Sequence, residues 1–157
     1  AIDVRGAASY YDMLGENAFG NYRTLIEQVA LHPMMGRYLT HLGNQKEDPA
    51  TGRLPDENFA REIMQLMSIG VHELNADGTL RIDGDGQPIA TYTSSDISNL
   101  AKVLTGFSWY AANPTNSTFR GGGRNNDSYV RPMIAYPAFH STSAKVFLGT
   151  TIPAGST

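Results

Sequence analysis

Three charged side chains, Glu57, Arg61 and Glu62, form the densest ionisable cluster of the sequence. In a helix, Glu57 lies one turn before Arg61, so the two can form an ion pair. Two carboxylates in different environments can divide the roles of general acid and general base, with the arginine as the orienting cation. The alternative is a structural ion pair with an acid at a helix N-terminus. The spacing favours this structural interpretation, because ion-pair networks often occur without catalysis.

The helix that carries this cluster is marked at both ends. Asp56 can cap the first turn and Gly70 can close the last one, which predicts a helix over 56–69. Apolar residues fill one arc of this helix, but Ile69 falls in the polar arc. An isoleucine there indicates that the polar face meets more protein. We therefore expect Arg61 to be substantially buried and bridged to a carboxylate.

The rest of the chain predicts a mainly α fold with a small β component, in which amphipathic helices pack around the helix of the charged cluster. Further helices are expected at 2–14, 19–32, 34–42 and 94–106, the last opened by a Thr93-x-x-Asp96 capping pattern. Asp-Gly turns predict a hairpin that pairs 79–82 with 89–92. Short strands are expected at 132–136 and 145–148, and a flexible loop at 113–127.

The two ends of the chain suggest one partial domain over 1–157. The sequence begins within a segment that has a helical pattern and ends in small and flexible residues. We expect an internal fragment of a larger helical domain, with exposed apolar surface where the remainder of its own polypeptide packs.

Several runs of the sequence together resemble one known family. The run Pro55-Asp56-Glu57-Asn58-Phe59-Ala60-Arg61-Glu62 is similar to the signature of the domain-of-unknown-function 1800 family, with Asp56 where the family usually has asparagine. Further similar segments are found at 16–21, 33–39, 88–93, 104–107 and 145–149. The resemblance implies a large, exported bacterial protein, periplasmic or extracellular, and it brings no reaction with it.

The resemblance also singles out one histidine, His140, which occupies the position of the family's histidine. Ser141 and Ser143 stand where the family usually has aspartate and, two residues further on, glycine. This departure weakens a pairing of His140 with an aspartate. We nevertheless include His140 with Glu57, Arg61 and Glu62 as the candidate catalytic residues.

Composition and spacing argue against several classes of function. The net charge is −3 with scattered basic residues, so a nucleic-acid partner is not expected. No apolar run approaches the roughly 20 residues of a membrane-spanning helix. Absence of cysteine excludes disulfides and thiolate sites. The histidines lack zinc-site spacing, and the Asp-Gly turns lack the glycine and glutamate positions of a calcium-binding EF-hand, so no metal or cofactor is expected.

Two functions remain open from the sequence. The first is a non-catalytic scaffold or binding module of the cell envelope, partnered by its own polypeptide or by an envelope protein or polymer. The second is a hydrolase-like or polymer-modifying envelope enzyme that uses Glu57, Arg61 and Glu62, with His140 nearby. The scaffold is favoured for this chain, because a partial domain can lack half of any catalytic site.

Overall fold

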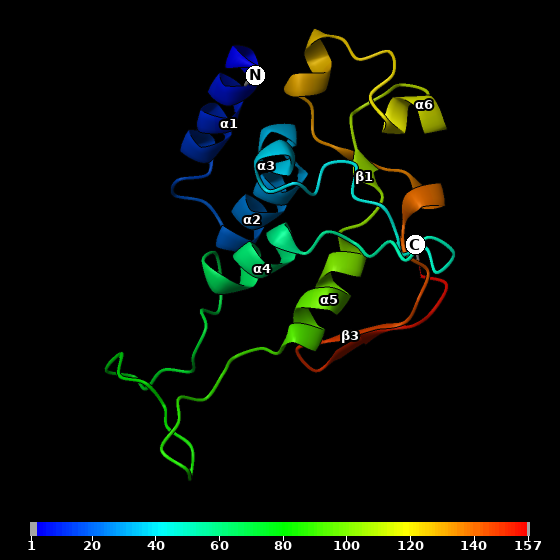
Figure 1. Cartoon of the computed structure of the whole chain (residues 1–157). Helices are drawn as coiled ribbons and strands as arrows, with labels where there is room; N and C mark the ends of the chain where they lie inside the picture. The colour runs from blue at the N-terminus through cyan, green and yellow to red at the C-terminus, as the bar shows by residue number, and fades with distance from the viewer. Residues whose placement is uncertain (1–2, 157) are drawn as a thin grey trace.

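The computed structural model describes residues 3–156, and its fold is mainly α with a small β component, as predicted. In Figure 1, α1 to α3 lie together, with α4 and α5 below them and the C-terminal strands beside α5. The helices are α1 (Val4–Glu16), α2 (Tyr22–Leu31), α3 (Pro33–Tyr38), α4 (Asn58–Gln65), α5 (Ser94–Val103) and α6 (Asn116–Phe119). The strands are β1 (Phe107–Ser108), β2 (Ile134–Ala135), β3 (Lys145–Phe147) and β4 (Thr150–Ile152), with two 3-10 turns, η1 (Asn126–Tyr129) and η2 (Pro137–Phe139).

Side-chain caps fix the starts of the helices. Thr93 and Asp96 form the predicted capping box of α5: the Thr93 hydroxyl oxygen accepts the Asp96 N–H at 3.2 Å, and the Asp96 carboxylate accepts the Thr93 N–H at 2.7 Å. The N-cap of α4 is Glu57, which makes no side-chain cap, but Asp56 just before it accepts the N–H of Asn58, the first residue of α4, at 2.9 Å. Each bond satisfies a donor that the first helical turn leaves unpaired.

Helices α4 and α5 pack through small and flexible side chains. Ala60 and Met64 of α4 meet Ile97 and Ala101 of α5, and all four are buried. The two alanines allow the helices a close approach, while the larger side chains fill the remaining space.

A glycine sets how closely α1 approaches α3. A Cβ atom at Gly6 would lie 2.7 Å from the Met34 sulfur and 3.0 Å from the backbone oxygen of Tyr129. Any larger residue would push α1 outward, because these atoms are already in contact distance. Gly6 therefore determines the depth of the space between α1 and α3.

Both small sheets are two-stranded and antiparallel, β1 with β2 and β3 with β4. The β3–β4 hairpin packs along α5 through backbone bonds to polar side chains. The Leu148 N–H donates to the Asp96 carboxylate at 2.8 Å, and the Val146 N–H donates to Asn99 Oδ1 at 3.3 Å. Helix α5 thus lies between α4 and the C-terminal hairpin.

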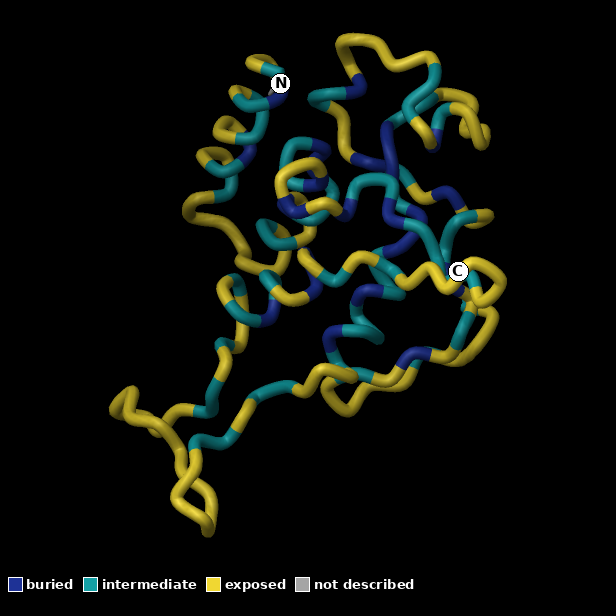
Figure 2. Tube along the Cα trace, viewed as in Figure 1, coloured by how far each residue is buried: buried dark blue, intermediate teal, exposed yellow. Residues whose placement is uncertain are grey.

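The segment 71–92 projects from the helices as an exposed arm (Figures 1 and 2). It contains the predicted antiparallel pairing: Ile82 bridges Pro88, and the Arg81 carbonyl accepts the N–H of Ile89 at 3.0 Å. The pairing consists of isolated bridges instead of a continuous ladder. Proline has no N–H to donate, which interrupts the ladder at Pro88.

A third strand-like segment of the arm was not predicted. Residues 71–75 run beside both predicted strands, with His72 opposite Ala90 and Leu74 opposite Leu80. The predicted partners of 79–80 are therefore replaced by this segment. The Asp-Gly pairs predict where the chain turns, but they do not indicate which segments pair on either side of the turns, so the strand-like character of 71–75 was not predicted.

Helices α3 and α4 end well before residues 42 and 69, where they were predicted to end, and α5 ends at Val103 instead of residue 106. Helix α3 ends at Tyr38, because Thr40 takes a positive φ of 63° that a helix cannot continue through. Helix α4 ends at Gln65, where the backbone widens into an irregular turn. Gly70, with φ of 73°, closes that turn by donating its N–H to the Met64 carbonyl at 3.0 Å, in the role predicted for it.

The predicted flexible loop at 113–127 contains local structure that the composition did not reveal. Thr115 caps α6 and Asn125 caps η1, each with a capping box. Phe119 is buried and stacks on Phe139, with ring centroids 3.7 Å apart. Mobility of this segment stays a prediction.

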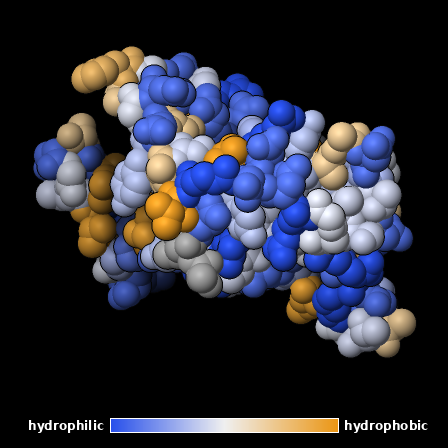
Figure 3. All heavy atoms as spheres, turned by 90° about the horizontal axis from the view of Figure 1, so that it is seen from above, coloured by the Kyte–Doolittle hydropathy of each residue, from blue (hydrophilic) through white to orange (hydrophobic). Residues whose placement is uncertain are grey.

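Exposed apolar side chains are present, in agreement with the sequence-based expectation. Seen from above, apolar residues interrupt an otherwise largely hydrophilic surface (Figure 3). Several lie on or beside the first three helices: Val4, Tyr11, Phe19, Tyr22 and Tyr38.

Candidate functional site

The predicted ion pair on α4 is present, but it is open to solvent. Arg61 Nη2 lies 3.3 Å from Glu57 Oε2, and the two side chains are 47% and 38% exposed. The other Glu57 carboxylate oxygen accepts the Ser98 hydroxyl at 2.6 Å, which ties α4 to α5. The prediction that Arg61 is bridged to a carboxylate is confirmed, and the prediction that it is substantially buried is wrong.

The reason for this error lies at the end of α4. The burial argument depended on Ile69 facing the same side as the charged residues of a helix that reaches residue 69. Since α4 ends at Gln65, the helical wheel does not apply to Ile69, which is itself 43% exposed. Glu62 is half-buried, and its carboxylate has no hydrogen bond or ion pair within residues 3–156.

His140 belongs to a different cluster, at the start of the C-terminal segment. Its Nδ1 lies 2.8 Å from the Thr105 carbonyl oxygen, so Nδ1 carries the proton and donates it. Nε2 is then an acceptor, and the Lys145 ammonium lies 3.5 Å from it. Gly106 makes this approach possible: its φ is 81°, and a Cβ atom there would lie 2.9 Å from the His140 nitrogen.

Lys145 is the charged centre of this cluster and is only 1% exposed. Its Nζ donates to the Ser141 carbonyl oxygen at 2.6 Å. Removal from water lowers the pKa of Lys145, an effect that the nearby Glu47 carboxylate partly opposes.

Glu47 completes the cluster from the loop before α4. Its Oε1 accepts the hydroxyls of Ser141, at 2.9 Å, and Ser143. Burial acts to raise the pKa of Glu47, but the hydrogen bonds from Ser143 and Ser141 and the charge of Lys102 hold it below its ordinary value. Its Oε2 is buried and has no hydrogen-bond partner among the described residues.

We name Glu47, Thr105, His140, Ser141, Ser143 and Lys145 the Lys145 cluster. It joins three segments that are distant in sequence, and its side chains bond mainly to one another. This arrangement suits a structural role, because the lysine ammonium is sealed from solvent. The available sequence signal was the alternation Ser141-x-Ser143-x-Lys145, which in an extended segment places three polar side chains on one face.

The structure therefore does not unite the four predicted catalytic residues in one site. Glu57 and Arg61 pair on the surface of α4, with Glu62 beside them and unpaired in the described chain. His140 contacts Thr105 and Lys145 instead.

The aspartates of the arm form turns, as the sequence favoured over calcium binding. The Asp77 carboxylate accepts the N–H and the hydroxyl of Thr79, and the Asp83 carboxylate accepts the N–H groups of Asp85 and Gln87. Within residues 3–156, no three histidine, aspartate or glutamate side chains converge as metal ligands. The helices described are also too short or too polar for any of them to cross a membrane.

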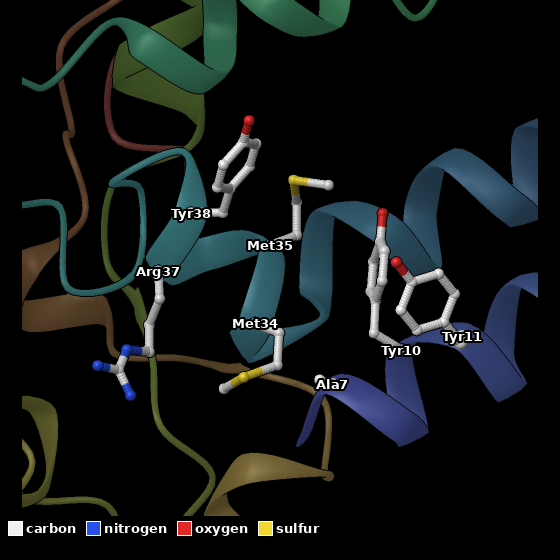
Figure 4. A pocket seen from close by; sticks show the side chains of 7 residues that line it. All are labelled: Ala7, Tyr10, Tyr11, Met34, Met35, Arg37 and Tyr38. Carbon is white, nitrogen blue, oxygen red and sulfur yellow. The ribbon is translucent and has the colours of Figure 1, made fainter. Parts of the chain in front are cut away.

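An apolar groove of about 600 Å³ lies between α1 and α3 (Figure 4). Tyr10 and Tyr11 of α1 lie across from Met34 and Met35 of α3, as Figure 4 shows. The groove is lined by Ala7, Tyr10, Tyr11, Met34, Met35, Arg37 and Tyr38.

Two tyrosines of the groove are strongly exposed. Tyr11 is 73% exposed and Tyr38 is 77% exposed. Arg37 lies at the far end of α3, where its side chain diverges from that of Tyr38 (Figure 4), and it forms no ion pair with a carboxylate of the described chain. The groove is thus lined by tyrosines, by Met34 and Met35, and by Arg37, which has no ion-pair partner in the described chain.

Comparison with known proteins gives the family. Neither the curated proteins nor the solved structures compared with the chain gave a significant match. One family model, described as "Protein of unknown function (DUF1800)", matches residues 2–157. Because this match spans essentially the whole sequence, the chain belongs to the DUF1800 family.

Proposed function

We propose that the chain is a non-catalytic scaffold or binding module of the bacterial cell envelope, and that a partner protein binds in the groove between α1 and α3. One observation carries the proposal: Tyr11 and Tyr38 are largely exposed in a groove that Met34 and Met35 also line. Exposed tyrosines at an apolar concavity are typical of interfaces, and methionine adapts to irregular partner surfaces.

The shape and charge of the groove favour an amphipathic helix as the bound element. A third helix can pack its apolar face into the groove between two others, with side chains at i, i+3, i+4 and i+7 as anchors. Arg37 at the end of the groove lacks a carboxylate partner in the described chain. A glutamate or aspartate on the incoming helix would pair with it.

The enzyme alternative has less support. Glu57 forms an i,i+4 ion pair with Arg61 and accepts a hydrogen bond from Ser98, which is the arrangement of a structural link between α4 and α5. His140, proposed to lie nearby, contacts the Lys145 cluster. Lys145 of that cluster is buried, and its ammonium donates to the Ser141 carbonyl oxygen.

The proposal is tested with a synthetic amphipathic peptide helix that carries leucine at the anchor positions and one glutamate at its polar edge. Binding to the full chain is measured by fluorescence anisotropy. We expect Tyr38→Ser to weaken binding ~10-fold or more, as for an interface hot spot. Leu54→Ser is the matched control, because Leu54 is equally exposed but outside the groove.

A charge swap sharpens the test. Arg37→Glu should weaken binding of the glutamate peptide and improve binding of the same peptide with lysine in that position. Equal losses in Tyr38→Ser and Leu54→Ser, or no response to the Arg37 swap, would contradict binding in this groove.

A further inference from the structure

The segment 109–131 carries a positive charge in an otherwise acidic chain. It contains Arg120, Arg124 and Arg131 but only one acidic residue, Asp127, while the whole chain has a net charge of −3. The segment includes α6 and η1, which lie away from α4 and the arm (Figure 1). An anion approaching the molecule meets its most favourable charge here.

Each of these arginines is stacked on an aromatic ring. The guanidinium carbon of Arg124 lies 4.9 Å from the centre of the Trp109 ring, and that of Arg131 lies 4.5 Å from the centre of the Tyr110 ring. Arg120 lies 5.4 Å above Phe139 and donates to the Asn116 carbonyl. Stacking fixes the plane of a guanidinium while leaving N–H groups at its edge for an anion.

No carboxylate within residues 3–156 forms an ion pair with any of the three. The two ion pairs of the described chain involve Arg61 and Arg81. The stacked arginines are therefore held in place by aromatic contacts and remain available to an external anion.

A cavity of about 300 Å³ lies beside two of these stacks. Its lining combines the aromatic pair and one stacked arginine with neutral polar side chains: Trp109, Tyr110, Arg124, Asn113, Thr118 and Asn125. The volume is at the lower end of the range for small-molecule sites. Side-chain amides and hydroxyls are suited to bonding the hydroxyl groups of a ligand.

We infer that this cavity binds an anionic saccharide unit, a sugar ring that carries a carboxylate, such as a uronate within a polysaccharide. Arg124 pairs with the carboxylate through its free edge, and Asn113 and Asn125 bond the ring hydroxyls. A neutral sugar fits the site less well, because it would need an open aromatic face. Trp109 is only 4% exposed, and Arg124 covers its ring.

A phosphate polymer also fits less well. Nucleic acids are bound by cations spaced along a track that follows the backbone. Here one arginine, Arg124, lines a cavity whose other polar groups are neutral hydrogen-bonding side chains. The site is separate from the groove between α1 and α3, since the two linings share no residue.

The test uses oligogalacturonate as the probe and the emission of Trp109, the only tryptophan of the chain, as the signal. We expect saturable binding at low salt. Arg124→Gln should weaken it ~10-fold or more, as for loss of a charge-assisted bidentate contact. Arg124→Lys should recover only part of the affinity, because lysine lacks the planar fork.

Asn113→Ala provides a variant that leaves the Arg124 stack intact, so the inference stays testable if Arg124→Gln misfolds. It should weaken binding several-fold with an unchanged far-ultraviolet circular dichroism spectrum. Arg23→Gln removes one exposed charge on α2 and is the matched control, expected to bind as the parent does. Tyr38→Ser should also bind the saccharide normally, which separates this inference from the groove proposal.

Four outcomes would overturn the inference. They are no binding at low salt, equal binding of the methyl-esterified neutral oligosaccharide, equal binding of a single-stranded oligonucleotide of the same charge, and an Arg23→Gln loss as large as that of Arg124→Gln. The second would exclude carboxylate recognition, and the last two would indicate non-specific attraction to charge.

Discussion

The charged face of α4 and the Lys145 cluster contain similar residue types in opposite environments. Glu57 and Arg61 are four residues apart, and their ion pair is open to solvent. Glu47 and Lys145 are almost a hundred residues apart, and Ser141 links them: its carbonyl accepts from Lys145 and its hydroxyl donates to Glu47. Water screens the ion pair of α4, whereas the buried Lys145 has lost its hydration and depends on protein hydrogen bonds. Proximity in sequence is therefore a poor guide to energetic importance here.

The largest expected effect is at Lys145. Lys145→Ala removes the buried donor to the Ser141 carbonyl and opens a cavity. We expect a loss of about 3–5 kcal/mol in the free energy of unfolding, measured by urea denaturation. Lys145→Met, which restores the apolar volume, should lose less. A loss below about 1 kcal/mol for the alanine variant would contradict the expected difference in stability between the buried Lys145 cluster and the exposed ion pair of α4.

Burial of His41 should make the stability of the fold depend on pH. Its ring stacks on that of Phe59, with ring centroids 3.9 Å apart. Nε2 lies 2.8 Å from the Ala30 carbonyl oxygen, so Nε2 is the protonated nitrogen. Nδ1 is buried without a partner among the described residues. Burial lowers the pKa of His41 to about 4, despite the opposing effects of Ala30 and the Asp56 charge.

The sign of the pH effect follows from this lowered pKa. The folded chain binds the proton more weakly than the unfolded chain, whose histidine pKa is about 6.5. The stability is complete above pH 6.5 or so and falls as the pH drops toward 4, by about 3 kcal/mol from this group. Urea melts between pH 4 and 7.5 should show a smaller fall in His41→Gln than in the parent. His72→Gln, in the arm, is the control, and equal slopes in the parent and His41→Gln would contradict the assignment.

Arg61→Ala should have a small effect. Among residues 3–156, Arg61 forms one ion pair, with Glu57, and both side chains are more than one-third exposed. We expect a loss of about 0.5 kcal/mol, in the range of exposed i,i+4 pairs, and a further reduction in high salt. Differential scanning calorimetry of the variant beside Lys145→Ala gives the comparison directly. A loss of several kcal/mol would mean that α4 is covered in solution.

Glu62→Gln should change stability least. The carboxylate has no bonded partner within residues 3–156, so a neutral isostere removes no described contact. We expect a difference within about 0.5 kcal/mol, as for surface substitutions away from packed features. A stabilisation of more than that would show that Glu62 is repelled by neighbouring acids.

Local signals predicted the fold better than the site. The capping box of Thr93 and Asp96 and the turn at Gly70 are each specified within a few residues of sequence, and both are present, as is a hydrogen bond from the α4 N-terminus to Asp56. These features depend on backbone groups close along the chain, so spacing alone specifies them.

The Lys145 cluster could not be predicted in the same way. Its formation depends on the position of Gly106 beneath His140 and on the loop that carries Glu47 toward Ser141. Such contacts join segments far apart in sequence, and the spacing of apolar and polar residues along the chain does not predict them. Only the alternation of Ser141, Ser143 and Lys145 hinted that one face of that segment is polar.

The arm at 71–92 has a consequence for engineering. It leaves and rejoins the helical body at one point, because the Thr91 N–H donates to the Val71 carbonyl at 3.1 Å and the Thr91 hydroxyl bonds to Gly70. The ends of the excursion are thus already closed by the protein itself. Lengthening a loop whose ends are fixed costs little, only about 0.6 kcal/mol for each doubling. The turn at Gly86 is therefore a suitable place to insert an epitope tag or a fluorescent label.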